Sequence, residues 1–350
     1  MLSNLPRDLE EDILSRVPLI SLRRLQSTCK RWYHHALFRD QRFIKTLFDK
    51  TVRQYQAFTL MDFRVYSVSF DTNKGPSLVL TDKLRVIDPL SNSEVDISQA
   101  FHCDGILLCT TTDNRFVALN PFSRQTRWIE PRNHHMRSEI YALGYDNKEL
   151  CHSYKILRFM GPHYQTVEIY EVRSNLWRNL DASPGGDLES LGVSLRGNTY
   201  WISKRRRVKG YLLLEFDFST EIFQKMCIPV QKTEFNDAMV LSAVREERLY
   251  LLYQCAKTRK MEIWVTNEID ETTVASWSKF LTVDFKSGIH MLFSRASFLV
   301  EEEKKIAVCC YQERISGLFI VGQDKYEKFV FSCRVIKCMP IVFGYVPRLV

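Results

Sequence analysis

The stretch Leu119–Trp128, LNPFSRQTRW, shows a pattern that recurs along the chain: a short apolar segment, a polar turn and then a large aromatic residue. Comparable endings occur at Tyr170–Trp177, Phe216–Phe223 and Trp264–Trp277. The aromatic residues that close these units are 49, 46 and 54 positions apart. A period near 50 residues is typical of the four-stranded blades of a β-propeller.

The chain from about Tyr55 onward consists mainly of strand-like segments rich in Val, Ile, Leu, Phe and Tyr, separated by turn residues. Because one twisted sheet cannot bury both of its faces, sheets arranged radially cover one another. We therefore expect a mainly β domain, a kelch-like β-propeller of about six blades. Tyr55–Phe70 would share a blade with Cys338–Tyr345 and so close the ring. A β-sandwich or an irregular barrel is the alternative, since the period is weak and the paired glycines usual in kelch blades do not recur from unit to unit.

The first 50 residues show helical spacing instead. Leu9, Ile13, Leu14 and Val17 lie along one face of a helix that Pro18 ends. Two more short helical patterns follow, and a unit this small buries only a small core. We therefore expect an all-α mini-domain over residues 1–50, whose remaining apolar surface needs a partner, followed by the β domain over residues 51–350.

The composition excludes several classes of protein. Hydrophobic residues make up 45% of the chain and charged ones 26%, which is ordinary for a globular protein. No stretch approaches the roughly 20 apolar residues that cross a bilayer, so we expect no membrane association. Ten cysteines occur without any C-x-x-C pair, which argues against a zinc site or a redox dithiol and favours buried thiols in an intracellular protein. Cys309 and Cys310 would lie on opposite faces of one strand.

A search for catalytic arrangements is negative. The chain has no G-x-S-x-G elbow, phosphate-binding loop, H-E-x-x-H motif or dinucleotide-binding glycine pattern. The pairs His34–His35 and His134–His135 have no acidic or cysteine partner at ligand spacing. We therefore expect no catalytic residue, no metal and no cofactor, and we expect the tryptophans to pack between blades.

One basic run stands out from the modest formal charge of +8. It comprises Lys204, Arg205, Arg206, Arg207 and Lys209 and lies between the strand-like segments Thr199–Ile202 and Tyr211–Phe218. This placement predicts a hairpin tip. Three interpretations remain open: a solvated loop, a nuclear-import signal, or a contact for an acidic target. A nucleic-acid partner is disfavoured, because the surplus of charge is small for this length.

The amino-terminal segment resembles the F-box motif. The residues that carry this resemblance are Leu5, Pro6, Leu9, Ile13, Leu14, Val17, Pro18, Leu22, Leu25, Cys29, Lys30 and Trp32. Thr28 departs from the pattern, because an apolar residue is common at that position. The remainder is similar to the type 1, kelch-like F-box-associated interaction domains of the large plant F-box family. That similarity is carried by Gly144–Asp146, Tyr154–Ile156, Gly197–Trp201, Glu262–Thr266, Ser276–Lys279 and Tyr345–Pro347.

The resemblance implies a substrate-recognition subunit of an SCF (Skp-cullin-F-box) ubiquitin ligase, which recruits a target protein for ubiquitination and degradation. The helices would bind a Skp-type adaptor, which links them to cullin and RING subunits, and this chain would be a non-catalytic subunit. The implied adaptor contacts are Leu5, Pro6, Leu9, Ile13, Leu14, Val17, Pro18, Leu22, Leu25, Cys29 and Trp32. The implied location is the nucleus, the cytoplasm or both. The alternative is a stand-alone β-propeller that binds glycan or nucleic acid without a ligase role.

Overall fold

The computed structural model describes Pro6, Leu9, residues 12–14 and most of the chain from 56 to 345. Within that last range it leaves out residues 72–76, 122, 131, 133–138, 147–151, 206–209, 231–232, 235, 245–246, 268–275, 285–291, 293–294, 313–315, 324 and 331–340. No helix among the described residues has the length and apolar character required to span a membrane.

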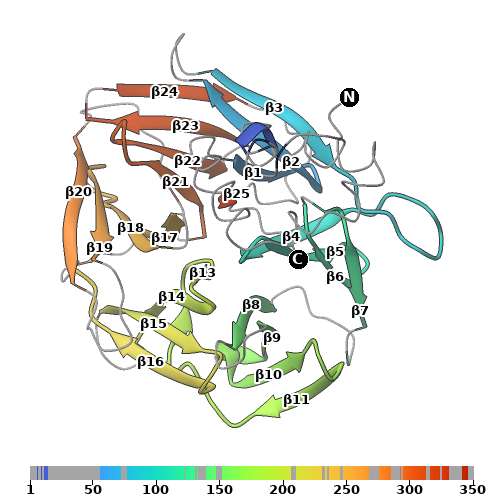
Figure 1. Cartoon of the computed structure of the whole chain (residues 1–350). Helices are drawn as coiled ribbons and strands as arrows, with labels where there is room; N and C mark the ends of the chain where they lie inside the picture. The colour runs from blue at the N-terminus through green and yellow to red at the C-terminus, as the bar shows by residue number, and fades with distance from the viewer. Residues whose placement is uncertain are drawn as a thin grey trace.

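The described strands form six antiparallel sheets arranged around an axis, as Figure 1 shows. Blade 1 contains β25 (Ile341–Tyr345), β1 (Gln56–Met61), β2 (Arg64–Asp71) and β3 (Ser77–Leu84). Blade 2 contains β4 (Ile97–Cys103), β5 (Ile106–Thr111), β6 (Phe116–Leu119) and β7 (Thr126–Ile129). Blade 3 contains β8 (Ile140–Asp146), β9 (Ser153–Met160), β10 (Thr166–Glu171) and β11 (Leu176–Leu180), and the short 3-10 turn η3 (Pro162–Tyr164) joins β9 to β10.

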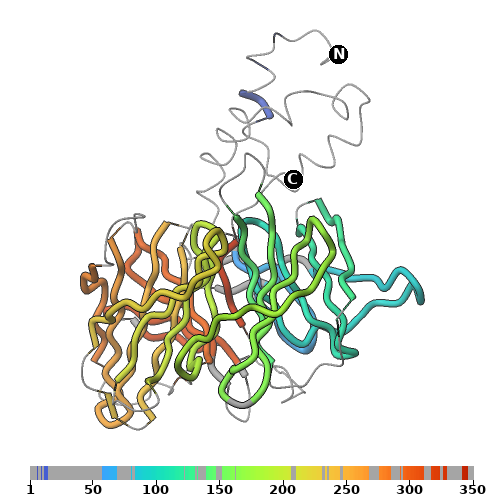
Figure 2. Tube along the Cα trace, turned by 90° about the horizontal axis from the view of Figure 1, so that it is seen from below, coloured from blue at the N-terminus to red at the C-terminus, as the bar shows by residue number. Residues whose placement is uncertain are grey.

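The other three blades complete the ring, which Figure 2 shows edge-on as a flat disc. Blade 4 contains β12 (Asp187–Leu188), β13 (Val193–Leu195), β14 (Asn198–Lys204), β15 (Tyr211–Asp217) and β16 (Ile222–Met226). Blade 5 contains β17 (Ala238–Val244), β18 (Arg248–Gln254), β19 (Met261–Thr266) and β20 (Trp277–Val283). Blade 6 contains β21 (Phe298–Glu301), β22 (Ile306–Gln312), β23 (Ser316–Gly322) and β24 (Lys325–Val330). The expectation of a mainly β propeller of about six blades is confirmed.

The core consists of apolar layers between neighbouring blades. Each layer takes residues from the facing sides of two adjacent sheets, and one such layer fills every junction around the ring. The middle strands of the blades are therefore buried on both faces and show near-continuous apolar runs, such as LLLEF in β15. Cys309 lies in the layer against blade 5 and Cys310 in the layer against blade 1, which confirms that they face opposite sides of β22.

The two ends of the β domain meet in blade 1. β25 pairs antiparallel with β1, with Gln56 opposite Tyr345 and Leu60 opposite Ile341. This pairing confirms the predicted closure, although residues 338–340 of the predicted strand lie outside the described residues. Because Gln56 and Tyr345 are neighbours, the chain enters and leaves the ring at one face. We call it the terminal face, and the other the opposite face.

The aromatic landmarks of the repeat all lie in the fourth strand of a blade. Trp128 is in β7, Trp177 in β11, Phe223 in β16 and Trp277 in β20. The indole N–H of Trp177 donates to the Glu130 carbonyl oxygen at 3.2 Å, and that of Trp277 donates to the Cys227 carbonyl oxygen at 3.2 Å. Each of these two tryptophans therefore connects its blade to the end of the preceding blade, which agrees with the expected packing role.

The described thiols are free, and most are buried. Cys103, Cys109, Cys309 and Cys310 are buried. Burial raises the pKa of the Cys109 thiol to about 12 and that of Cys310 to about 12, so both remain protonated. The prediction of buried thiols is wrong for Cys227, which is exposed just after β16. Cys227 follows β16, the edge strand of blade 4, in which most residues are already exposed.

Candidate functional site

The described part of the amino-terminal segment presents two aliphatic side chains to solvent. Leu9 and residues 12–14 are helical, and the Leu9 amide donates to the Pro6 carbonyl oxygen at 3.1 Å. Leu9 is 51% exposed and Ile13 is 44% exposed, whereas Leu14 is 2% exposed. Residues four apart lie on the same face of a helix, so Leu9 and Ile13 form one exposed apolar patch. Pro6 is exposed as well, and Leu14 points into the protein.

The remaining predicted adaptor contacts lie outside the described residues. These are Leu5, Val17, Pro18, Leu22, Leu25, Cys29 and Trp32. The structure therefore brings together only Pro6, Leu9 and Ile13 at the surface, and the role of all of these residues stays a prediction.

The predicted basic hairpin is present in blade 4. β14 and β15 pair antiparallel with Lys204 opposite Tyr211, and the Lys204 ammonium lies 5.9 Å from the centre of the Tyr211 ring. Lys204 and Arg205 are exposed, whereas Arg206, Arg207 and Lys209 lie outside the described residues. The Arg205 amide donates to the Gly210 carbonyl oxygen at 3.3 Å, so the two ends of the tip lie close together.

Sequence reasoning missed a second basic turn, in blade 5. Residues Lys257–Lys260, KTRK, lie between β18 and β19, and Lys257 and Arg259 are exposed there. Lys260 forms an ion pair with Glu262 at 3.3 Å. The short KTRK run could be read in the sequence as a charged turn between two strand-like segments. Only the folded ring shows that this turn lies in the blade next to the basic turn of blade 4.

A cavity of about 780 Å³ at the centre of the ring is lined by residues of all six blades. The lining is mostly neutral and rich in hydroxyl groups, with Ser98, Thr110, Ser190, Ser242 and Ser297 among its residues. Its charged members are Asp96, Glu139 and Arg295. Asp96 forms an ion pair with Arg64, and Arg295 donates to the Tyr164 hydroxyl at 2.8 Å. This volume lies within the range of small-ligand sites, but the charges on its walls are largely satisfied within the protein.

Glu139, on the cavity wall, belongs to a buried charge network in blade 3. Arg158 is 1% exposed and donates to Glu139 from Nη2 at 2.9 Å and from Nε at 3.1 Å. A third bond runs from Arg158 Nη1 to Glu168 at 3.2 Å, and the Tyr141 hydroxyl donates to Glu139. Burial raises the pKa of Tyr141 further above its ordinary value, and the Glu139 carboxylate adds to that effect. Because these groups satisfy one another, the network stabilises blade 3 rather than offering a free acid or base.

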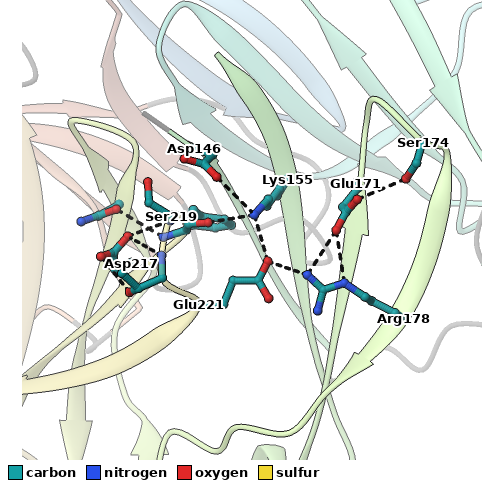
Figure 3. Close-up of polar contacts among 11 residues, drawn as sticks. Asp146, Lys155, Glu171, Ser174, Arg178, Asp217, Ser219 and Glu221 are labelled. Carbon is teal, nitrogen blue, oxygen red and sulfur yellow. Dashed lines mark hydrogen bonds and ion pairs between the residues drawn. The ribbon is translucent and has the colours of Figure 1, made fainter. Parts of the chain in front are cut away.

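A second polar network joins blade 3 to blade 4, as Figure 3 shows. Lys155 is largely buried and donates to the Phe218 carbonyl oxygen at 3.0 Å and to Glu221 at 2.9 Å. Arg178 donates to the same Glu221 carboxylate and to Glu171 at 3.2 Å. Glu221 thus accepts from two cations of the neighbouring blade. This geometry fixes one blade against the next.

The terminal face carries a His–Asp contact between blades 2 and 3. Asp104 Oδ2 accepts from the Tyr154 hydroxyl at 2.6 Å and lies 2.9 Å from His152 Nδ1. The His152 ring stacks on Tyr145 with ring centres 3.8 Å apart. Burial lowers the pKa of His152, which favours the neutral imidazole. Like the networks above, this contact joins one blade to the next. Within the described residues, no three His, Cys, Asp or Glu side chains are grouped so as to hold a metal ion.

Two family models match successive parts of the chain. Residues 2–39 match the F-box domain, and residues 56–350 match the F-box associated beta propeller domain. Among curated proteins, the putative F-box protein At3g17560 of Arabidopsis thaliana is 46% identical over 411 residues, which span all of this chain and 98% of that protein. The F-box/kelch-repeat protein At3g17530 of the same plant is 42% identical over all of this chain and 95% of its own length. The six-bladed ring agrees with the two family matches, and relatives named as F-box proteins span the whole chain. The chain therefore belongs to the F-box proteins with an F-box associated β-propeller domain.

Proposed function

We propose that this protein is the substrate-recognition subunit of an SCF-type ubiquitin ligase. In this proposal residues 1–50 bind a Skp-type adaptor, which connects them to cullin and RING subunits, and residues 51–350 hold the target. The protein supplies no catalytic group; it holds the target near a ubiquitin donor and so raises the effective concentration of the two reactants. It acts inside the cell, in the nucleus, the cytoplasm or both.

The observation that supports this function is the exposed pair Leu9 and Ile13 within the segment that matches the F-box domain. Two neighbouring aliphatic side chains on one helix face suit the apolar groove of a partner protein. The propeller supports the second half of the proposal, since its turns are joined to rigid blades and are free to vary between targets.

The test is co-purification of the full chain with a Skp-type adaptor. Full burial of one Leu or Ile side chain contributes about 1.5–3 kcal/mol, so Leu9→Glu with Ile13→Glu should weaken binding by at least about a hundredfold. Binding affinity is measured by titration of the purified adaptor. Leu14 is left unchanged, because it is buried within this chain and its substitution would disturb folding.

A matched control replaces two exposed aliphatic residues of the propeller. Leu176 is 66% exposed and Ile222 is 56% exposed, so Leu176→Glu with Ile222→Glu makes the same chemical change elsewhere. The control should bind adaptor as the parent does. Equal binding by all three proteins would contradict the assigned helix face, and absence of binding by the parent would contradict the ligase role.

A further inference from the structure

The two basic turns lie on the same face of the ring. At the terminal face, the Tyr345 hydroxyl contacts the Gly105 carbonyl oxygen at 3.4 Å, and the neighbouring Asp104 contacts His152. The contacts continue to blade 4, where the Tyr145 amide donates to the Gly197 carbonyl oxygen at 3.1 Å. β14 starts beside Gly197 at the terminal face, so its far end and the basic turn after it lie at the opposite face.

The second basic turn adjoins the first. Asp237 precedes β17, and its Oδ1 accepts from the Ala256 amide, in the turn between β18 and β19, at 2.8 Å. The other oxygen of Asp237 accepts from the Tyr253 hydroxyl at 2.8 Å. Tyr211, whose ring lies near the Lys204 ammonium, packs against the same apolar layer between blades 4 and 5 as Tyr253. The turns of blades 4 and 5 are therefore neighbours.

Several cations at this place are available to a partner. Lys204, Arg205 and Lys257 are exposed and form no ion pair among the described residues. Arg295, at the rim of the central cavity, is exposed and donates to the Tyr164 hydroxyl.

We propose that the opposite face over blades 4 and 5 binds an acidic segment of the target protein. This inference rests on the proposed function, since it assigns the target site of the same propeller. The chain enters the ring at Gln56 and leaves it at Tyr345 on the terminal face, so this surface is on the other side of the ring from both points. The exposed ammonium and guanidinium groups of Lys204, Arg205 and Lys257, held at the ends of neighbouring strands, are complementary to Asp and Glu side chains.

The surface fits a polypeptide better than a nucleic acid. The carboxylates Glu189, Glu234 and Glu262 are interspersed with the cations, and Glu262 already neutralises Lys260 and Lys279. A phosphate backbone carries evenly spaced charge and would meet repulsion from such groups. In a protein segment, Asp and Glu residues can be separated by neutral residues. Its carboxylates can then lie against the cations of this surface while its neutral residues lie against Glu189, Glu234 and Glu262.

The test uses the full chain together with its adaptor and a labelled peptide of alternating glutamate and serine as the probe. Binding is measured by fluorescence anisotropy at low and at physiological salt, since exposed charge pairs are screened by ions. Arg205→Glu with Lys257→Glu should weaken binding by at least about tenfold. The control, Arg248→Glu with Lys304→Glu, changes the net charge equally on exposed residues of blades 5 and 6, at the start of β18 and in the turn between β21 and β22. It should stay within about twofold of the parent.

The outcomes separate the alternatives. Equal losses in both variants would show that only net charge matters and would overturn the assigned surface. Tighter binding of an RNA oligonucleotide of equal net charge would overturn the choice of a protein partner, as would absence of peptide binding at low salt. Adaptor binding is measured on the same samples: if it persists while the peptide does not bind, this inference fails and the proposed ligase role stands.

Discussion

At the blade junctions, single charged residues are partly buried because they pair with opposite charges of the neighbouring blade, and Glu221 is the clearest case. Its carboxylate lies between Lys155 and Arg178 of the neighbouring blade. Burial alone would raise the pKa of Glu221, but the hydrogen bonds from Arg178 and Lys155 outweigh burial and lower the pKa below its ordinary value of 4.5. Ionised Glu221 therefore stabilises the folded state.

Glu221→Gln keeps the shape of the side chain and removes its charge. We expect a loss of about 1–2 kcal/mol in the free energy of unfolding at pH 7, because Lys155 is largely buried and loses an anionic partner. The folded-state pKa is lowered, so this stabilisation is complete above pH 4.5 and is lost as pH falls through the folded-state value. Parent and variant should converge in acid. Urea unfolding between pH 7 and pH 3 measures this difference.

The comparison for that experiment is Glu303→Gln, which changes an exposed carboxylate in the turn between β21 and β22. It should leave the unfolding free energy unchanged at every pH. A gap between parent and Glu221→Gln that stays constant down to pH 3 would contradict the role assigned to the ionised carboxylate.

At the scale of the element, the fourth strand explains why the repeat was readable in the sequence. In blades 2 to 5 this strand carries a large aromatic residue, so Trp128, Trp177, Phe223 and Trp277 recur at blade spacing. The ionic networks were not predictable, because Arg158 and Lys155 appear in sequence as ordinary charged positions of strands. Only the register of β9 with its neighbours, and the position of the next blade, bring carboxylates to them.

Two tryptophans of blade 5 provide a paired test of the fourth-strand contact. Trp277 donates its indole N–H to the Cys227 carbonyl oxygen, whereas the buried Nε1 of Trp264 has no acceptor among the described residues. Trp277→Phe should cost about 1 kcal/mol more in unfolding free energy than Trp264→Phe, because only the first removes a hydrogen bond. Chemical denaturation of both variants measures the difference. Equal costs, or a larger cost for Trp264→Phe, would show that the bond to Cys227 does not hold blade 5 to blade 4.

At the scale of the whole molecule, closure of the ring creates features that no single segment contains. The periodicity predicted the number of blades and the shared blade 1, since both follow from strand order. The central cavity and the pairing of the basic turns of blades 4 and 5 were not predictable. They depend on which strands become innermost and on the face at which each turn emerges. The run Lys204–Lys209 was visible in the sequence, but Lys257–Lys260 begins 53 residues after Lys204. The two runs become neighbours only when blades 4 and 5 pack side by side in the ring.

The closing strand β25 allows a test of the ring as a unit. Ile341, Val342 and Tyr345 are 9%, 1% and 6% exposed, and they pack in the layers on both sides of blade 1. Full burial of three such side chains contributes roughly 5–9 kcal/mol, which is comparable to the total stability of a typical domain. A chain that ends at Pro340 should therefore fail to fold cooperatively, as judged by circular dichroism and limited proteolysis.

The same strand placed at the other end of the β domain should restore folding. Because Tyr345 lies opposite Gln56, an Asn-Gly turn between them would join β25 to β1 as a hairpin and keep their register. A permuted β domain that starts at Ile341 and continues from Gln56 should recover cooperative unfolding, because closure depends on the β25–β1 pairing and not on its order in the chain. Recovery by the permuted chain, with failure of the truncated one, would establish that this pairing holds the ring closed. Cooperative folding of the truncated chain would instead mean that the ring is stable with β1 as an open edge.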